Sequence, residues 1–437
     1  MKIAVIGLGK IGLPLAAQFA DRGHEVTGVD INAATVETIN AGDVPFPGED
    51  HLDEYVERLV KSGHLRATTD YADAVPSADA VVVVVPLFVD GDGRPDFGWM
   101  DTSSHDIGKH LTTDTLVIYE TTLPVGTTRD RWKPMLEADS GLREGHDFHL
   151  VFSPERVLTG RVFADLRKYP KLLGGLSAAG AAAACDFYEQ VLTFDERPDL
   201  ERGNGVWDLG SAEAAEMAKL AETTYRDVNI GLANQFAVFA EKTGIDVHQV
   251  IEASNSQPYS HIHQPGIAVG GHCIPVYPRL YLSGDADATV VSAARAANAA
   301  MPAHVVGRLA ERLGDLTGVR VAVLGAAYRG GVKETAFSGV FDTVRSLQEH
   351  GAVVTVHDPM YSDEELAGLG LTPHHLGSDV DAVVVQSDHA EYAELTGADI
   401  PGSRLVVNGR PGLRIDLGGT PEVLVVGVGT PESSVGN

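Results

Sequence analysis

The sequence begins with an apolar stretch that runs directly into a glycine-rich turn, and this constrains the fold more than any other feature. Residues 2–7 (KIAVIG) are typical of a buried strand, and residues 11–20 have the apolar spacing of a helix. Between them lies Gly7-Leu8-Gly9-Lys10-Ile11-Gly12, and a second strand, 25–30, ends on Asp30. Strand, G-x-G-x-x-G turn, helix and acidic strand end together form the fingerprint of a dinucleotide-binding βαβ unit.

Each part of this fingerprint has a chemical reason. Glycines let a pyrophosphate approach the helix N-terminus, and Asp30 can accept hydrogen bonds from ribose hydroxyls. A carboxylate at this place disfavours a 2′-phosphate, so the pattern favours NAD over NADP. The alternative is a sheet domain that binds no nucleotide. The cofactor-binding candidates are Gly7, Gly9, Lys10, Ile11, Gly12 and Asp30.

The same strand-turn-helix pattern occurs twice in the chain. Valine-rich strands are expected near residues 80–86, 115–122 and 148–154, and the pattern returns from residue 319 and closes at 405–410. Strands that are apolar on both faces and separated by helices predict parallel sheets covered on both sides.

The middle of the chain is different. Residues 211–244 lack proline and are rich in alanine, which predicts one long helix, and residues 289–301 predict another helix that Pro302 stops. The predicted fold is therefore α/β, with two Rossmann-like doubly wound parallel-sheet domains joined by a long central helix and an all-helical region. The expected limits are 1–200 for the NAD-binding domain, 205–302 for the central domain, 315–428 for the second sheet domain and 429–437 for a disordered tail.

Charge and cysteine content exclude several classes of protein. The formal net charge of −28 argues against nucleic-acid binding, which depends on neutralising phosphates with Lys and Arg. The longest purely apolar run, residues 80–85, is too short to cross a membrane. Two cysteines make no disulfide framework, and the N-terminus has no signal-peptide pattern, so a cytoplasmic protein is expected. No metal site is expected.

Cys273 is the residue that most suggests chemistry. It lies in GIAVGGHCIPVYP, residues 266–278, where two glycines precede it and no apolar periodicity surrounds it. A nucleophilic thiol needs a partly exposed site of this kind, whereas Cys185, on an apparent helix, fits an inert core thiol. His272 precedes the nucleophile candidate and can point elsewhere.

Other polar residues are ambiguous when each is taken alone. Glu155, in SPER at a strand end, suits a general base, but such a glutamate is more often part of a solvated ion pair. Lys219, on the alanine-rich helix, would ordinarily be a surface residue. Arg329, Lys333 and Arg410 fall at turns after strands and suit a diphosphate or sugar, or are simply exposed cations.

Taken together, the order of these motifs resembles the UDP-glucose/GDP-mannose dehydrogenase family over nearly the whole chain. The matching segments are IGLGKIGLPLA, SPERVLTGR, AEMAKLAE followed by YRDVNI, PGIAVGGHCIPV, LGAAYR and NGR. The HCIPV form and the RDVNI segment are most similar to the branch that acts on UDP-N-acetyl-D-mannosamine or UDP-N-acetyl-D-glucosamine.

This resemblance implies a mechanism and a set of site residues. It implies that two NAD molecules in succession oxidise a sugar C6 alcohol to a uronic acid, for polysaccharide biosynthesis, through a cysteine thiohemiacetal and thioester. Cys273 matches the nucleophile, Glu155 the residue that manages water or a proton, and Lys219, with Thr223 one turn later, the group that stabilises an oxyanion. The remaining implied positions are Pro86, Thr121 and Thr122 for NAD, and Arg156, Val157, Leu158, Gly266, Gly270, Gly271, Tyr328, Arg329 and Arg410 for the UDP-sugar.

The match has departures. Many members have asparagine where this chain has Thr223, and aspartate where it has Tyr277. The third domain usually reads Y-K-K-D with an arginine soon after, whereas here Arg329, two glycines and Ala336 occur. We expect the Tyr277 hydroxyl or Glu155 to take over the lost role, or thioester hydrolysis to be slow.

Three other functions stay open at this point. A UDP-glucose 6-dehydrogenase fits the same motifs. A single-step NAD-dependent hydroxy-acid dehydrogenase would need neither Cys273 nor a second sheet domain, and a non-catalytic NAD-binding homologue would not need to retain Glu155, Lys219 and Cys273 together. The resemblance also implies a homodimer or higher homo-oligomer, with the long helix 211–244 as its interface. The alternative is that the apolar positions of this helix pack against the chain's own sheet domains.

Overall fold

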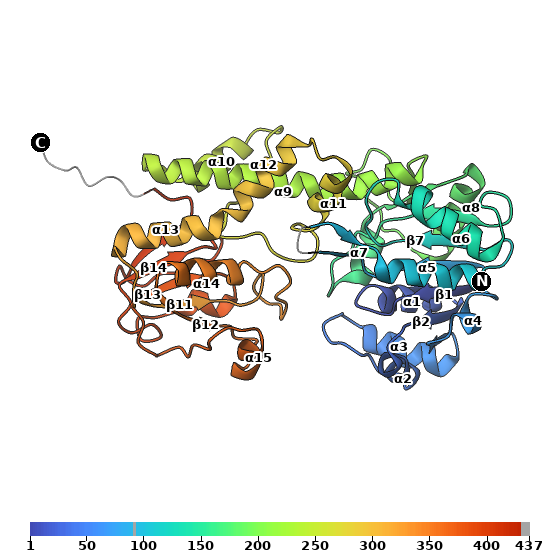
Figure 1. Cartoon of the computed structure of the whole chain (residues 1–437), viewed down its shortest axis with the longest axis horizontal. Helices are drawn as coiled ribbons and strands as arrows, with labels where there is room; N and C mark the ends of the chain where they lie inside the picture. The colour runs from blue at the N-terminus through green and yellow to red at the C-terminus, as the bar shows by residue number, and fades with distance from the viewer. Residues whose placement is uncertain (91–92, 430–437) are drawn as a thin grey trace, which may run out of the picture. The chain divides into compact units, whose positions relative to one another are not determined.

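The computed structural model describes residues 1–90 and 93–429. The chain forms two compact units, Met1–Ala221 and Glu222 onward, and the division falls inside one long helix (Figure 1). The three predicted domains are a finer division, and their limits stay a prediction. The predicted tail, 429–437, falls outside the described residues except for Gly429.

The first unit contains an eight-stranded sheet with the order β10-β9-β8-β7-β4-β1-β2-β3. Its pairings are parallel, as predicted, except that β8 runs antiparallel to β9. The strands are β1 Lys2–Ile6, β2 Glu25–Val29, β3 Leu65–Thr68, β4 Ala80–Val83, β7 Leu116–Tyr119, β8 His149–Phe152, β9 Lys171–Gly175 and β10 Val206–Asp208. A short hairpin joins β5 Phe88–Val89 to β6 Pro95–Asp96.

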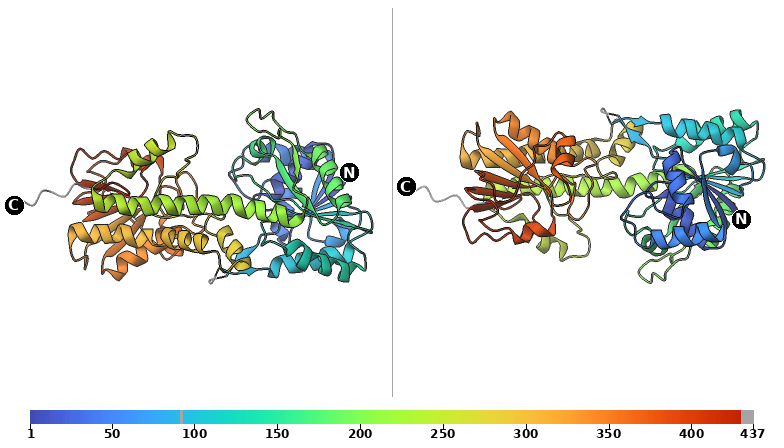
Figure 2. Two further views of the ribbon diagram at one scale, coloured as in Figure 1. Left: turned by 90° about the horizontal axis from the view of Figure 1, so that it is seen from above. Right: turned by 90° about the horizontal axis from the view of Figure 1, so that it is seen from below.

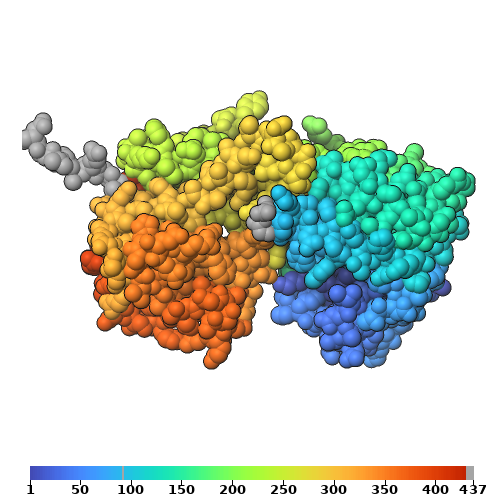
Figure 3. Space-filling model, viewed as in Figure 1, coloured from blue at the N-terminus to red at the C-terminus, as the bar shows by residue number. Residues whose placement is uncertain are grey.

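Helices cover both faces of this sheet because alternate strand residues point to opposite sides. On β1, Ile3 and Val5 belong to one core cluster, and Ala4 and Ile6 belong to another. Segments before residue 90 (blue) and after residue 100 (teal) form one continuous surface in Figure 3. The helices are α1 Gly12–Asp21, α2 Ala33–Asn40, α3 Leu52–Ser62, α4 Tyr71–Ala74, α5 Gly98–His110, a π-helical turn η1 Thr128–Trp132, α6 Lys133–Ser140, α7 Val162–Lys168 and α8 Ala178–Val191.

The second unit contains a five-stranded parallel sheet, with the order β12-β11-β13-β14-β15. Its strands are β11 Arg320–Leu324, β12 Val353–His357, β13 Ala382–Val385, β14 Leu405–Asn408 and β15 Glu422–Val425. The expectation that residues 405–410 close this domain was wrong, because β15 pairs beyond β14. The elements beside the sheet are α13 Met301–Leu313, α14 Val340–Glu349, α15 Asp363–Gly368 and the 3₁₀ turn η2 Ala390–Glu394.

The central region is helical. The predicted long helix is confirmed as α9, Ala212–Thr243, which runs without a break in both views of Figure 2. It is followed by α10 Val247–Asn255, α11 Tyr277–Gly284 and α12 Thr289–Ala299. The prediction that Pro302 ends a helix was wrong. Pro302 lies in the first turn of α13, where its missing N–H costs nothing.

No helix among the described residues is long and apolar enough to cross a membrane.

Candidate active site

The fingerprint turn lies at the carboxyl edge of the first sheet, between β1 and α1. A Cβ on Gly12 would lie 1.8 Å from the Gly7 carbonyl oxygen, so only glycine permits this close approach. Asp30 stabilises the turn, because its carboxylate accepts the N–H of Leu8 at 2.9 Å. Gly9 faces open space, with nothing within 4 Å of an added Cβ. The turn therefore offers bare backbone to a pyrophosphate, and the residues fit NAD.

Three further predicted cofactor residues lie at the same edge. Pro86 follows β4 and is exposed, while Thr121 and Thr122 follow β7. The Thr121 hydroxyl donates to the Val85 carbonyl at 2.7 Å and so joins the ends of the two strands. Lys10 is exposed in the fingerprint turn, and Ile11 packs on the adjacent core. The structure thus brings these residues together around the point where the strand order reverses, between β4 and β1.

Glu155 lies after β8 at this edge, but it is not a solvated ion pair. Its Oε2 accepts from the ammonium of Lys171 at 2.8 Å, and its Oε1 accepts the Arg156 N–H at 2.6 Å. The same ammonium donates to Glu120 Oε2 at 3.0 Å, and the Tyr188 hydroxyl donates to Glu120 Oε1 at 2.5 Å. Glu155 is therefore the outer member of a buried cluster of charged and polar side chains.

The two carboxyl groups of this cluster titrate differently. Burial raises the pKa of Glu120 to about 7, against the charge of Lys171. Burial also acts on Glu155, but the charge and hydrogen bond of Lys171 and the Arg156 N–H outweigh it and lower its pKa. Glu155 is consequently an ionised carboxylate at neutral pH, as a general base must be.

The three predicted substrate residues after Glu155 point in different directions. The Arg156 guanidinium donates to the Pro170 carbonyl at 3.3 Å, and Val157 packs against the first core cluster. Leu158 is exposed, and its N–H is held by Asp165 at 3.1 Å. Only Leu158 of these three presents an exposed side chain.

Lys219 and Thr223 lie one turn apart on α9, which places them on the same face of the helix. The ordinary expectation of an exposed lysine is wrong here, since Lys219 is only 9% exposed and Thr223 is also buried. Glu216, one turn earlier, is fully buried and accepts the Gly126 N–H at 2.6 Å. This contact ties the start of α9 to the loop after β7.

Cys273 is exposed and lies just before α11 in the second unit. Its carbonyl accepts the N–H of Tyr277 at 2.9 Å, which starts the helix and fixes the cysteine backbone. The His272 ring contacts Glu334, with Nε2 3.3 Å from Oε2. Cys185, by contrast, is half-buried on α8 against the core, and burial raises the pKa of its thiol. The two cysteines thus differ as predicted.

Gly270 and Gly271, which precede Cys273, pack closely on the second sheet domain, and Gly266 makes an ordinary contact with it. A Cβ on Gly270 would lie 2.6 Å from the Tyr328 Cβ, and one on Gly271 would lie 3.0 Å from the Tyr328 ring. One on Gly266 would lie 3.4 Å from the Gly409 carbonyl oxygen. Tyr328 follows β11 and Gly409 follows β14, so the cysteine loop lies over the carboxyl edge of this sheet.

Arg410 holds this loop in place. Its guanidinium donates to three backbone carbonyls, those of Gln386 at 2.7 Å, Ala268 at 3.2 Å and Tyr328 at 3.1 Å. Arg329 instead lies exposed over its own neighbour, with Nε donating to the Tyr328 hydroxyl at 3.2 Å. Lys333 pairs with Glu365.

A buried polar chain fixes the beginning of the same loop. Asn234 on α9 accepts the Gly266 N–H at 3.0 Å and donates to Asn298 on α12 at 2.8 Å. Asn298 in turn donates to Asp227, which also accepts from Arg295 at 2.6 Å. These contacts place α12 along α9, as Figure 2 also shows.

Sequence reasoning missed Glu120, Lys171, Tyr188, Asn234 and Glu216. A usable signal existed for two of them, because Glu120 follows the apolar strand LVIY and Lys171 begins the apolar strand KLLGG. A charged residue bounding a buried strand needs a partner.

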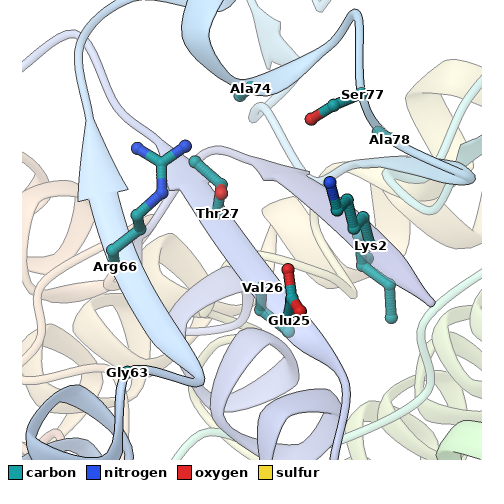
Figure 4. Close-up of a pocket in the computed structure, with 10 residues that line it drawn as sticks. Lys2, Glu25, Val26, Thr27, Gly63, Arg66, Ala74, Ser77 and Ala78 are labelled. Atoms are coloured by element: carbon teal, nitrogen blue, oxygen red, sulfur yellow. The ribbon is translucent and has the colours of Figure 1, made fainter.

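A separate surface hollow lies at the amino ends of β1 and β2, with Lys2, Arg66 and Ser77 around it (Figure 4). It is on the edge of the sheet opposite the fingerprint turn, where ligands of such folds do not collect. No group of three or more residues able to hold a metal ion occurs in the described part of the chain.

Three parts of the UDP-glucose/GDP-mannose dehydrogenase family profile match the chain. The NAD binding domain matches residues 1–192, the central domain matches 213–300 and the UDP binding domain matches 322–414. A UDP-N-acetyl-D-mannosamine dehydrogenase of Pyrococcus horikoshii is 34% identical over 419 residues, which are 94% of this chain and 95% of the relative.

Solved structures agree with this assignment. A UDP-D-ManNAc dehydrogenase structure from Pyrococcus horikoshii has a TM-score of 0.86 at 32% identity, covering 99% of this chain and all of that one. A UDP-glucose dehydrogenase from Pyrobaculum islandicum has a TM-score of 0.83 at 27% identity, covering 98% of both chains. The chain therefore belongs to the UDP-glucose/GDP-mannose dehydrogenase family and is an NAD-dependent UDP-sugar dehydrogenase.

Proposed function

We propose that this enzyme oxidises the C6 alcohol of a UDP-N-acetylhexosamine to the uronic acid, with Cys273 holding the sugar covalently. The observation that carries the proposal is the exposed Cys273 thiol in a glycine loop over the carboxyl edge of the UDP-binding sheet. The names of the relatives support an N-acetylated sugar, since several are UDP-N-acetyl-D-mannosamine dehydrogenases.

The chemistry has two oxidations and one hydrolysis. Bound NAD supplies the oxidant, since its nicotinamide accepts one hydride in each of two rounds. The Cys273 thiol adds to the aldehyde as a thiohemiacetal, the second oxidation leaves a thioester, and water then releases the acid and restores the thiol. In total, one alcohol, two NAD+ and one water give one carboxylate, two NADH and three protons.

The remaining residues have roles that follow from their surroundings. The ionised Glu155 carboxylate takes the proton from the attacking water. The Lys219 ammonium, with Thr223 one turn away, stabilises negative charge on the sugar oxygen. We assign the UDP-sugar contacts to two sets of residues, each considered within its own unit. The first unit provides Arg156, Val157 and Leu158, and the second provides Gly266, Gly270, Gly271, Tyr328, Arg329 and Arg410, of which Arg410 also holds the cysteine loop.

The proposed assembly is a homodimer that uses α9. The large apolar side chains exposed on this helix include Met217 near its start and a later group, namely Tyr225, Leu232, Phe236 and Phe239; the interface is assigned to this later group. Their spacing of seven, four and three residues places them on one helix face. Phe236→Glu should turn a dimer into a monomer in sedimentation experiments, and a monomeric wild type would refute this interface.

The proposed location is the cytoplasm, because the proposed nucleophile Cys273 must stay a reduced thiol.

The test measures NADH formed per sugar consumed, together with the product mass. Purified enzyme is given NAD+ and UDP-glucose, UDP-N-acetylglucosamine, UDP-N-acetylmannosamine or UDP-N-acetylgalactosamine. We expect two NADH and a uronic acid from an N-acetylated sugar, with loss of the acid in Cys273→Ala and not in the matched control Cys185→Ala.

Other outcomes would refute the proposal. One NADH and an aldehyde from both wild type and Cys273→Ala would make the enzyme a simple alcohol dehydrogenase. Formation of acid from UDP-glucose alone would show that the substrate is UDP-glucose and not a UDP-N-acetylhexosamine. No NADH from any sugar, with NAD still bound, would favour a non-catalytic homologue.

A further inference from the structure

One ammonium group in the first unit lies between two buried carboxyl groups. Lys171 Nζ is 2.8 Å from Glu155 Oε2 and 3.0 Å from Glu120 Oε2. The Glu120 side chain is fully buried, that of Lys171 is 4% exposed and that of Glu155 is 11% exposed. Glu155 is thus the member nearest to solvent, and Glu120 is the innermost.

Each charged or titratable neighbour comes from a different element. Glu120 directly follows β7, Lys171 begins β9 and Glu155 lies in the loop after β8. Tyr188 lies on α8, with its hydroxyl on Glu120 Oε1 and its ring 4.8 Å from the Lys171 ammonium. The loop, two strands and a helix therefore meet around one cation.

The charges of this cluster do not balance when both carboxyl groups are ionised. Two carboxylates and one ammonium leave one buried negative charge, which is costly in a medium of low polarity. A proton on either carboxyl removes this cost. Glu155 has the Arg156 N–H at 2.6 Å to stabilise its charge, whereas Glu120 is deeper in the protein.

We infer that Lys171 is a positioning residue that orients Glu155, and that the proton held by this cluster at neutral pH resides on Glu120. The inference rests on the proposed function, because it describes how the proposed general base stays ionised. Lys171 and Glu120 touch neither substrate nor the reacting atoms, and they act through Glu155.

This arrangement makes the base strength of Glu155 depend on pH. When Glu120 loses its proton, a second negative charge appears beside Glu155, which makes Glu155 a stronger base. Burial raises the pKa of Glu120 to about 7, so Glu120 loses its proton in the physiological range of pH. Thioester hydrolysis should therefore become faster as pH rises through about 7.

A first experiment needs no substrate. Burial also raises the pKa of Glu216 to about 7, so infrared difference spectra between pH 6 and pH 8 are recorded in a Glu216→Gln background. They should contain the band of a protonated carboxyl group that ionises near pH 7, and adding Glu120→Gln should remove this band. Glutamine can turn its carbonyl oxygen toward Lys171 and its amide toward the Tyr188 hydroxyl, so it fits the site. If the band persists in Glu120→Gln, the proton is elsewhere and the inference is wrong.

A second experiment measures kcat against pH in the acid-forming reaction. Tyr188→Phe keeps the ring but removes a hydrogen bond that favours ionised Glu120, so the inflection near pH 7 should move upward by roughly one pH unit. Tyr119→Phe is the matched control, because it loses a buried hydroxyl contact to Ser104 and belongs to the core cluster on the opposite sheet face. It should leave the inflection in place.

Changes at Lys171 complete the test. Lys171→Met should lower kcat with little change in the KM for sugar, and Lys171→Arg, which keeps the charge, should restore part of it. A purely structural role would lower protein stability in every variant without moving the inflection. Acid formation with an inflection unmoved by Glu120→Gln and Tyr188→Phe would overturn this inference alone, whereas absence of acid in the wild type would overturn the proposed function.

Discussion

The Glu216 carboxylate accepts both the backbone N–H and the hydroxyl hydrogen of Thr128, at 2.9 and 2.7 Å. Its other oxygen accepts the Gly126 N–H at 2.6 Å. One side chain of α9 thereby holds the first turn of η1 and the loop after β7. Because Lys219 lies one turn further along α9, this contact also sets where that ammonium lies relative to the first sheet.

The stability that Glu216 provides should depend on pH. Burial raises its pKa from 4.5 to about 7, so the folded protein binds this proton more tightly than the unfolded chain does. That contribution is complete below about pH 4.5 and is lost as pH rises through about 7. Glu216→Gln does not titrate. The difference in unfolding free energy, wild type minus variant, should therefore shrink by roughly 1 kcal/mol between pH 6 and pH 8.

Glu213 on the same helix is the control of opposite sign. Its hydrogen bond to Arg129 lowers its pKa, so its contribution is present above its unfolded pKa and is lost only as pH falls toward the folded value. Glu213→Gln should show no shrinking difference between pH 6 and pH 8. Calorimetric melts of both variants would check this, and parallel curves for wild type and Glu216→Gln would contradict the assignment.

Two glycines of the fingerprint turn should respond differently to alanine. Gly12→Ala would place a Cβ 1.8 Å from the Gly7 carbonyl oxygen, so we expect a lower melting temperature and loss of NAD binding. Gly9→Ala meets nothing within 4 Å, so the melting temperature should hold while the new methyl group blocks the pyrophosphate. Calorimetric titration with NAD+ and thermal melts separate the two effects. Unchanged NAD affinity in Gly9→Ala would place the pyrophosphate elsewhere.

Much of the fold could be predicted because its signals are local. The Gly7–Gly12 turn, the apolar run of β1 and the proline-free stretch that forms α9 each depend on neighbouring residues. The β8–β9 pairing and the strand β15 could not be predicted in this way. Packing determines which strands pair when they are far apart in the sequence. The local sequences LLGG of β9 and EVLV of β15 do not indicate which strand each one pairs with.

Some residues of the candidate site could likewise be predicted from local motifs, and others could not. Cys273 and Asp30 lie in motifs whose spacing is informative, so sequence alone indicated them. Lys171 and Glu120 come together only when the sheet forms, since 51 residues separate them. Arg410 was predicted as a ligand contact, which stays a prediction, and the structure shows that its guanidinium also donates to three backbone carbonyls. No pattern along the chain distinguishes these two uses of an arginine.

Close packing under the cysteine loop predicts a sensitive position at Gly270. Gly270→Ala would place a Cβ 2.6 Å from the Tyr328 Cβ and 2.9 Å from the Phe337 carbonyl oxygen. Since backbone must move to relieve this, we expect a loss of about 1–3 kcal/mol and slower turnover. Gly307→Ala on α13 meets nothing within 4 Å and should instead stabilise the protein by about 0.5–1 kcal/mol. Equal melting temperatures for the two variants would show that the loop is not packed against Tyr328.

Arg410 should control the order of the loop that carries Cys273. Arg410→Ala removes donors from the carbonyls of Gln386, Ala268 and Tyr328, which should cost about 3 kcal/mol and speed amide exchange in residues 266–271. Arg410→Lys should not restore protection, because the three carbonyls are bonded by three separate guanidinium nitrogens, and the single ammonium nitrogen of lysine cannot occupy all three places. The exposed Arg414 is the control, and Arg414→Ala should leave exchange unchanged. Loss of UDP-sugar binding in Arg410→Ala with unchanged exchange would instead make Arg410 a direct ligand contact.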